Sequence, residues 1–287
     1  MSISKPYYRI LRPNTESCSY VRDTRYASDR LQLARAYINI EKKLREIFNY
    51  IEPDERNLGT FSFELYTLLL RACTEVELNC QLILKANGAK PSGKYFTMED
   101  YRKLEKSSLL SKYKIILPNW KSTTSDESVE YGKYEFFPFE DFGINKKPQW
   151  YQAYNHVKHD REGKLEEANF KNCIQAVGAI LALIYSQFGG YCIEPFNNDW
   201  KLYAITEDRY DGIFDADVIF EVVPPRREDW DDEEKYEFNW KKLKTEGMPF
   251  QKFDFNAVNI KRNAEEDCKE KQTLETADED MSSNLTS

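Results

Sequence analysis

The segment from Leu165 to Phe188 constrains the fold of this chain more than any other part of the sequence. Small and branched residues recur in it at the three- and four-residue spacing of one helix face, and Gly189-Gly190 follows as a typical helix stop. The residues of this face are Ala168, Asn172, Ala176, Ala179, Ile180, Leu183 and Ile184. Small side chains let neighbouring helices approach closely, so the pattern predicts the central helix of a helical bundle.

This apolar helix is not expected to cross a membrane. Its most apolar part, Ile174–Phe188, is shorter than the ~18 apolar residues that span a bilayer, and it contains Gln175, Gly178 and Gln187. The first residues lack the apolar core of a secretory signal. With a mean hydropathy of -0.72 and 31% charged residues, the sequence predicts a soluble, cytoplasmic protein without a membrane partner.

Several further segments have helical periodicity and are predicted to surround the central helix. Residues 29–51 and 61–85 give two long amphipathic helices that should pair as an antiparallel hairpin, and residues 98–111 and 149–160 give two shorter ones. The fold class expected is therefore mainly α, an up-and-down helical bundle over residues 29–190. An irregular N-terminal segment, residues 1–28, precedes it.

The remaining segments have a different character. A brief strand is predicted at Lys114–Leu117, and residues 119–147, rich in Ser and Thr and then in aromatics, are expected to form a long loop that packs onto the bundle. Short segments at residues 200–206 and 213–223, rich in β-branched and aromatic residues, predict a small β-rich appendage over residues 191–260. Residues 261–287 have almost no large apolar residues and should form a disordered acidic tail.

Charge and composition exclude several classes of function. The net charge of -8 argues against a broad basic surface that would bind nucleic acid. Much of the negative charge lies in residues 228–237 and 265–280, however, so the rest of the chain is closer to neutral and could contain a local basic pocket. The six cysteines contain no Cys-x-x-Cys pair, and the only histidines are His156 and His159. No metal site is expected, because a zinc site needs clustered Cys and His ligands. No cofactor is expected either, because phosphate-binding glycine loops and dinucleotide fingerprints are absent, and nucleophile elbows are absent as well.

Polar residues that could carry chemistry cluster between positions 154 and 161. On a helix, Asn155, Lys158 and His159 share a face, and Arg161 lies three residues after Lys158. Two cations beside an imidazole suit a phosphate: the cations hold its charge, and an imidazole with an ordinary pKa of about 6.5 can move a proton. The same cluster also fits an ordinary solvated helix terminus.

A second pair, Arg71 and Glu75, lies four residues apart in the predicted helix of residues 61–85. Such pairs are most often exposed salt bridges worth only ~0.3–0.5 kcal/mol. This helix is apolar over much of its circumference, however, so Glu75 could face the interior and orient His159, as a carboxylate orients a catalytic imidazole.

The run Trp150-Tyr151-x-x-Tyr154-Asn155-x-Val157-Lys158-His159-Asp160-Arg161, followed by Ala168-Asn169 and a long Ala-rich helix, resembles divergent bacterial members of the HEPN superfamily (higher eukaryote and prokaryote nucleotide-binding). The resemblance covers about residues 29–190. It implies a four- or five-helix bundle, usually dimeric, and for many members a metal-independent ribonuclease of phage defence or stress response.

One motif departs from that family. The usual arginine four to six residues before the histidine is missing here, since Arg161 follows His159 and Lys158 is the nearest preceding cation. Only His159 carries over as a catalytic acid or base, with Asn155 as a polar partner. The resemblance implies that the protein is a homodimer and that its partner is RNA or a nucleotide. The alternative is a non-catalytic helical interaction protein that binds a protein partner and in which the Asn-x-x-Lys-His cluster is structural.

Overall fold

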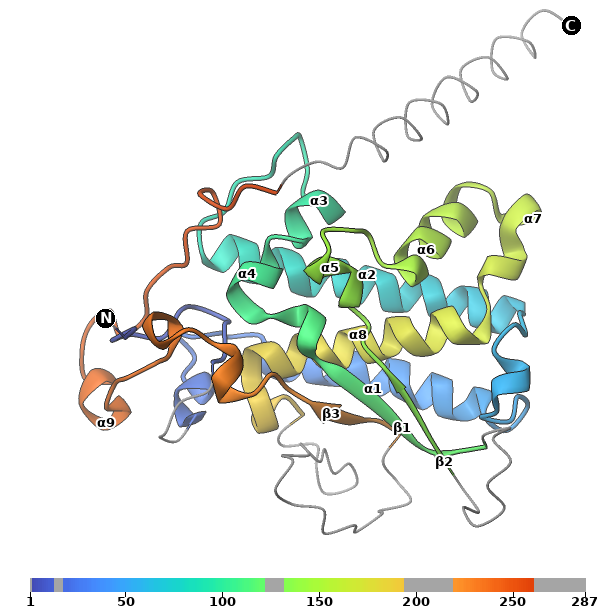
Figure 1. Cartoon of the computed structure of the whole chain (residues 1–287), viewed down its shortest axis with the longest axis horizontal. Helices are drawn as coiled ribbons and strands as arrows, with labels where there is room; N and C mark the ends of the chain where they lie inside the picture. The colour runs from blue at the N-terminus through green and yellow to red at the C-terminus, as the bar shows by residue number, and fades with distance from the viewer. Residues whose placement is uncertain (1, 13–17, 122–131, 194–218, 261–287) are drawn as a thin grey trace, which may run out of the picture.

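The computed structural model describes residues 2–12, 18–121, 132–193 and 219–260. The long helices are α1 (Arg30–Ile47), α2 (Phe63–Ala86) and α8 (Phe170–Phe188), with the shorter α6 (Gln149–His159) beside them. The helix α8 packs against each of the other three (Figure 1). A mainly α fold with a small β part is thereby confirmed. The predicted acidic tail lies outside the described residues.

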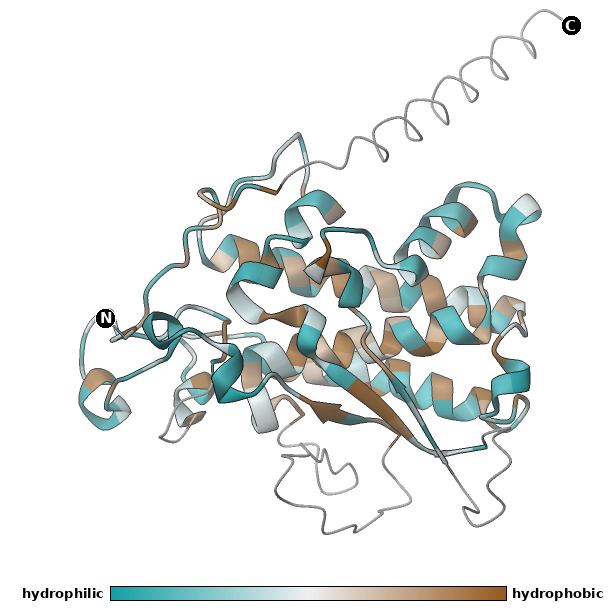
Figure 2. Ribbon diagram, viewed as in Figure 1, coloured by the Kyte–Doolittle hydropathy of each residue, from teal (hydrophilic) through white to brown (hydrophobic). Residues whose placement is uncertain are grey.

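The central position of α8 follows from its composition. Nearly every side chain along it is buried, including those of Ala176 and Ala179, and α8 packs against α2. Within the described residues, Phe170–Tyr191 is long and apolar enough to cross a membrane by length and composition, and 89% of its most apolar stretch is buried in the protein. Figure 2 shows the hydrophobic residues of α8 in the middle of the molecule and mostly hydrophilic ones along α6 and α7 (Arg161–Lys164).

Polar caps set the ends of the long helices. The side chain of Ser62 accepts a hydrogen bond from the backbone of Leu65 at 3.2 Å at the start of α2. At the start of α8, Asn169 accepts one from the backbone of Asn172 at 3.0 Å. The prediction that this last helix begins at Leu165 was therefore wrong, because the cap at Asn169 separates it from a 3-10 turn at Leu165–Glu167.

The predicted helix over residues 98–111 is divided in two. Its described parts are α3 (Met98–Tyr101) and α4 (Leu104–Ser108), followed by a 3-10 turn at Leu110–Lys112. The helix α4 ends at Leu109, whose backbone is left-handed with φ of 48°. A residue in this conformation ends a helix, and apolar periodicity alone does not reveal it.

The segment of residues 119–147 was predicted as a loop, and for its described residues, 119–121 and 132–147, this was wrong. Strand β1 (Lys114–Trp120) extends into it and pairs with β2 (Gly132–Phe136), which is followed by the short helix α5 (Glu140–Gly143). The third strand, β3 (Glu221–Val223), pairs with the other edge of β1, so the antiparallel sheet has the order β2-β1-β3. Periodicity did not reveal the hairpin, because its stability comes from pairing and from burial against α8.

Gly178 allows the sheet to approach α8 closely. A Cβ atom at this position would lie 2.7 Å from the Phe136 ring and 3.3 Å from the Ile115 side chain. Neither distance leaves room for a methyl group without movement of the neighbouring side chain. The sheet therefore depends on a glycine in the most buried helix of the fold.

The described residues after β3 pack against the N-terminal segment. They contain 3-10 turns at Arg227–Asp229 and Asp232–Glu234 and the short helix α9 (Trp240–Leu243). Isolated bridges join Ile3 to Tyr236 and Tyr7 to Gln251, and the guanidinium of buried Arg12 lies 4.5 Å from the Trp230 ring centroid. Residues 200–206 and 213–218 of the predicted β-rich appendage lie outside the described residues, and the described end of the predicted segment 213–223 contains β3.

The N-terminal segment takes part in the same core. It is irregular, as predicted, apart from a 3-10 turn at Cys18–Arg22 and its two bridges. Tyr20 and Tyr26 from this segment, and Phe250 and Phe255 from the C-terminal part, belong to the hydrophobic cluster that also contains the long helices. The two described terminal parts are thus anchored through buried aromatic rings.

Candidate functional site

The candidate site lies where α6 ends and α7 begins. Asp160 separates the two helices, and its side chain accepts a hydrogen bond from the backbone amide of Gly163 at 2.9 Å. A Cβ atom at Gly163 would lie 2.5 Å from the Asp160 carboxylate. The chain therefore turns at this corner, and a side chain at position 163 would force the capping Asp160 carboxylate to move.

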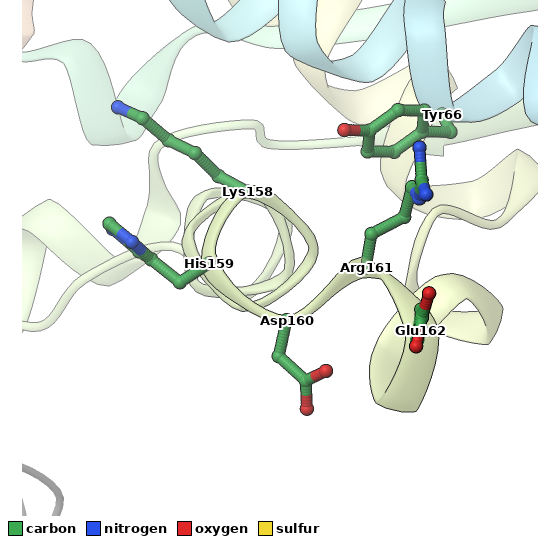
Figure 3. Close-up of a pocket in the computed structure, with 6 residues that line it drawn as sticks. All are labelled: Tyr66, Lys158, His159, Asp160, Arg161 and Glu162. Carbon is green, nitrogen blue, oxygen red and sulfur yellow. The ribbon is translucent and has the colours of Figure 1, made fainter. Parts of the chain in front are cut away.

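An open, shallow pocket of about 370 Å³ occupies this corner. It is lined by Tyr66, Lys158, His159, Asp160, Arg161 and Glu162 (Figure 3). Three of the four predicted catalytic residues, Lys158, His159 and Arg161, therefore line one pocket. Asn155 lies one turn earlier on α6, half-buried, and is not part of the lining.

His159 is exposed at the last position of α6. Neither His159 nor Asn155 makes a side-chain hydrogen bond or an ion pair with any residue that the structure describes. A histidine that served as a structural brace would bond to a neighbouring helix, because an unsatisfied buried polar group costs ~1–3 kcal/mol. The imidazole of His159 is instead available to a ligand.

Lys158 is held by an aromatic residue of its own helix. Its Nζ donates a hydrogen bond to the Tyr154 hydroxyl at 3.1 Å and lies 5.0 Å from the centroid of that ring. This hydrogen bond, with the nearby charge of Glu77, raises the pKa of the Lys158 ammonium, although partial burial opposes the change. Lys158 is therefore a fixed positive charge on one side of the pocket.

Arg161 provides positive charge on the opposite side. In Figure 3 its side chain turns toward Tyr66, whereas Lys158 and His159 point away from it. Its guanidinium carbon lies 5.8 Å from the centroid of the Phe63 ring, a cation–π contact at the start of α2. The two cations of the pocket thus come from one corner of the chain, and α2 positions one of them.

The predicted orienting pair lies elsewhere on α2. Arg71 is exposed and Glu75 is half-buried, and burial raises the pKa of Glu75 while the charge of Arg71 lowers it. The predicted hydrogen bond between Glu75 and His159 is not formed. The carboxylate that reaches α6 is that of Glu77, which accepts a hydrogen bond from the Tyr151 hydroxyl at 2.7 Å.

One carboxylate–imidazole pair was not predicted. Nδ1 of His156 lies 2.7 Å from Oε2 of Glu167, and Nζ of Lys164 lies 3.4 Å from Oε1 of the same carboxylate. His156 is on α6 three residues before His159, and its side chain is 52% exposed. Sequence spacing gave no signal for this pair, since Glu167 reaches His156 only because the chain reverses through α7 and the following 3-10 turn.

Other nucleophiles and metal ligands in the described residues do not form a competing site. Cys73, Cys80 and Cys173 are fully buried free thiols, and burial raises the pKa of each. Within the described ranges, no group of three or more His, Cys, Asp or Glu side chains could hold a metal ion.

Comparisons with known proteins add no identification. No protein-family model matches the chain, and no similar protein was found among the curated proteins or the solved structures.

Proposed function

We propose that the pocket at the corner of α6 and α7 binds RNA and that His159 transfers protons in its metal-independent cleavage, as in a HEPN-like ribonuclease. The observation that carries this proposal is the exposed, unbonded imidazole of His159 in a pocket with Lys158 and Arg161. Phosphates are held by cations, and cleavage next to a ribose 2′-hydroxyl needs only proton transfer.

The arrangement of helices supports the same proposal at the level of the fold. Helices α1, α2, α6 and α8 contact one another in the pairs expected of a bundle around α8, and Figure 1 shows α1, α2 and α8 side by side along the long axis of the molecule. We propose that they form an up-and-down bundle of the HEPN kind.

The proposed reaction needs two proton-transfer groups. One takes the proton from the ribose 2′-hydroxyl as its oxygen attacks phosphorus, and the other gives a proton to the 5′-oxygen as the bond from phosphorus to that oxygen breaks. A 2′,3′-cyclic phosphate and a free 5′-hydroxyl result. His159 is one group, and solvent water, which reaches this open pocket, is the second.

The two carboxylates of the pocket limit how an anion can enter. Asp160 and Glu162 both line it, and Figure 3 shows the Asp160 side chain directed away from Lys158 and Tyr66. Asp160 also accepts the Gly163 amide hydrogen bond, which disperses part of its charge. A phosphate is therefore expected between Lys158 and Arg161, on the side facing Tyr66.

A non-catalytic interaction protein is the second candidate function. The observation that favours it is the shape of the pocket, which is open and shallow, whereas enzymes commonly enclose their reacting groups to exclude water. In that case the cluster at the α6–α7 corner would contact a protein partner.

The resemblance to HEPN proteins extends the proposal to assembly and setting. We propose a cytoplasmic homodimer that acts in phage defence or a stress response. Sedimentation equilibrium tests the dimer directly: a mass near 68 kDa, twice the 33.9 kDa chain, supports it, and a single species at the mass of one chain contradicts it.

The reaction itself is tested by analysis of its products. The protein is incubated with a mixed RNA pool and a chelator, and the ends of the fragments are determined by mass spectrometry. The proposal predicts 2′,3′-cyclic phosphate and 5′-hydroxyl ends, and no cleavage of DNA of the same sequences. Intact RNA, or equal cleavage of DNA, would contradict it.

A further inference from the structure

Phe63 is an exposed aromatic residue beside the pocket. It is not among the described residues that pack against the hydrophobic core. Phe63, the first residue of α2, is 60% exposed, although a phenylalanine gains stability from burial. Its ring meets that of Tyr66, which lines the pocket, in an edge-to-face contact with centroids 6.4 Å apart. Phe63 and Tyr66 thus form an aromatic surface that continues from the pocket into solvent.

A cation is fixed on the same aromatic surface. The guanidinium of Arg161 lies 5.8 Å from the Phe63 ring centroid and beside Tyr66 in Figure 3. Arginine both stacks on flat rings and forms paired hydrogen bonds with phosphate. An aromatic plane with a phosphate-binding cation next to it matches the two parts of one nucleotide, its base and its phosphate.

We propose that Phe63, Tyr66 and Arg161 form a nucleobase subsite that receives an unpaired base of single-stranded RNA. The inference rests on the proposed function, since it assigns the substrate class of the same pocket. The base stacks on the exposed part of the Phe63 ring, and the adjoining phosphate lies between Arg161 and Lys158. Bases in a duplex have both faces covered by their neighbours, so paired RNA cannot use this subsite.

Phe61 offers a matched control two residues away. It is also a largely exposed phenylalanine, at 49%, but it makes no ring or cation–π contact with described residues and does not line the pocket. Phe61→Ala therefore removes a similar amount of exposed aromatic surface without touching the proposed subsite. Because both side chains are exposed, neither replacement is expected to lower the thermal midpoint.

The test measures binding without cleavage. The probe is a fluorescent decamer of 2′-O-methyl RNA, which lacks the attacking hydroxyl. It is prepared in three forms: a single strand, a duplex and an abasic single strand. Each form is titrated with wild type, Phe63→Ala, Phe63→Trp and Phe61→Ala. We expect Phe63→Ala to weaken single-strand binding roughly 5- to 150-fold, the equivalent of about 1–3 kcal/mol for one stacked base. Phe61→Ala should stay within about twofold, Phe63→Trp should bind at least as well as wild type, and wild type should bind the duplex and the abasic strand weakly.

The outcomes separate this inference from the proposed function. If wild type binds the single strand but Phe63→Ala and Phe61→Ala behave alike, or the abasic strand binds equally well, the subsite is wrong while RNA binding stands. If wild type binds the duplex as tightly as the single strand, the assigned substrate class is wrong. Absence of binding to every form of RNA overturns both proposals.

Discussion

Glu41 should make the stability of this protein depend on pH in a direction unusual for a carboxylate. It lies in the middle of α1 with only 3% of its surface exposed, and burial raises its pKa from 4.5 to about 8. The charge of Arg45 and a hydrogen bond from the backbone amide of Ile219 act in the opposite direction. The folded protein therefore keeps a proton on Glu41 over a range in which the unfolded chain has lost it.

The sign and the size of the effect follow from proton linkage. Because the folded pKa is the higher one, the contribution of Glu41 to stability is fully present below pH 4.5 and is lost as the pH rises through about 8. For these two pKa values the loss is about 1 kcal/mol at pH 5 and about 4 kcal/mol at pH 8. A change of about 3 kcal/mol is large against the ~5–15 kcal/mol stability of a typical domain.

Glu41→Gln isolates this contribution. The amide oxygen of glutamine can still accept the hydrogen bond from Ile219, but the side chain has no proton to lose. The free energy of unfolding in urea is measured for both proteins from pH 5 to pH 8, and the advantage of the variant over wild type should grow by about 3 kcal/mol. Glu46→Gln, at an exposed position of the same helix, is the control for the substitution itself. A difference between Glu41→Gln and wild type that stays constant from pH 5 to pH 8 would refute the reasoning.

Three further changes test the fold by urea or thermal unfolding. Ala179→Phe should cost ~1–3 kcal/mol by overpacking the buried face of α8, and a neutral result would place that face at the surface. Gly178→Ala should also destabilise, by ~1–3 kcal/mol, because the added Cβ would meet the Phe136 ring at 2.7 Å; unchanged stability would mean that the sheet is farther from α8. Deletion of residues 261–287 should leave the thermal midpoint unchanged, since their composition supplies little apolar surface to bury, and a fall of several degrees would show that they dock.

Local patterns were sufficient to predict the long helices and the positions of β1 and β3, but neither β2 nor the pairing of the strands. The apolar periodicity of α1, α2 and α8 repeats over several turns, and each helix appears close to its predicted range. Strand β3 has only three residues, Glu221–Val223, and its partner in the sheet is β1, far earlier in the chain. Local composition marked both segments as extended, but it does not say which strands pair, so only the three-dimensional arrangement reveals the sheet.

The site was predictable to the same limited extent. Lys158, His159 and Arg161 line one pocket because they are neighbours in sequence at a helix end. Which carboxylate meets which histidine depends instead on the turn through Asp160 and Gly163, which brings Glu167 to His156. The same turn places Arg161 over Phe63, and no spacing rule relates residues so far apart in the chain.

The central claim is that His159 acts on RNA and does not brace the fold. The most direct measurement compares wild type, His159→Ala and Gln152→Ala. Gln152 is an exposed residue of α6 outside the pocket and serves as the control. For each protein, the rate of RNA cleavage in the presence of a chelator and the thermal midpoint are determined on the same preparation. The account predicts a loss of ~10²–10⁴ in rate for His159→Ala alone, with an unchanged midpoint. No cleavage by wild type, together with a midpoint lowered by His159→Ala, would contradict it in favour of the interaction protein.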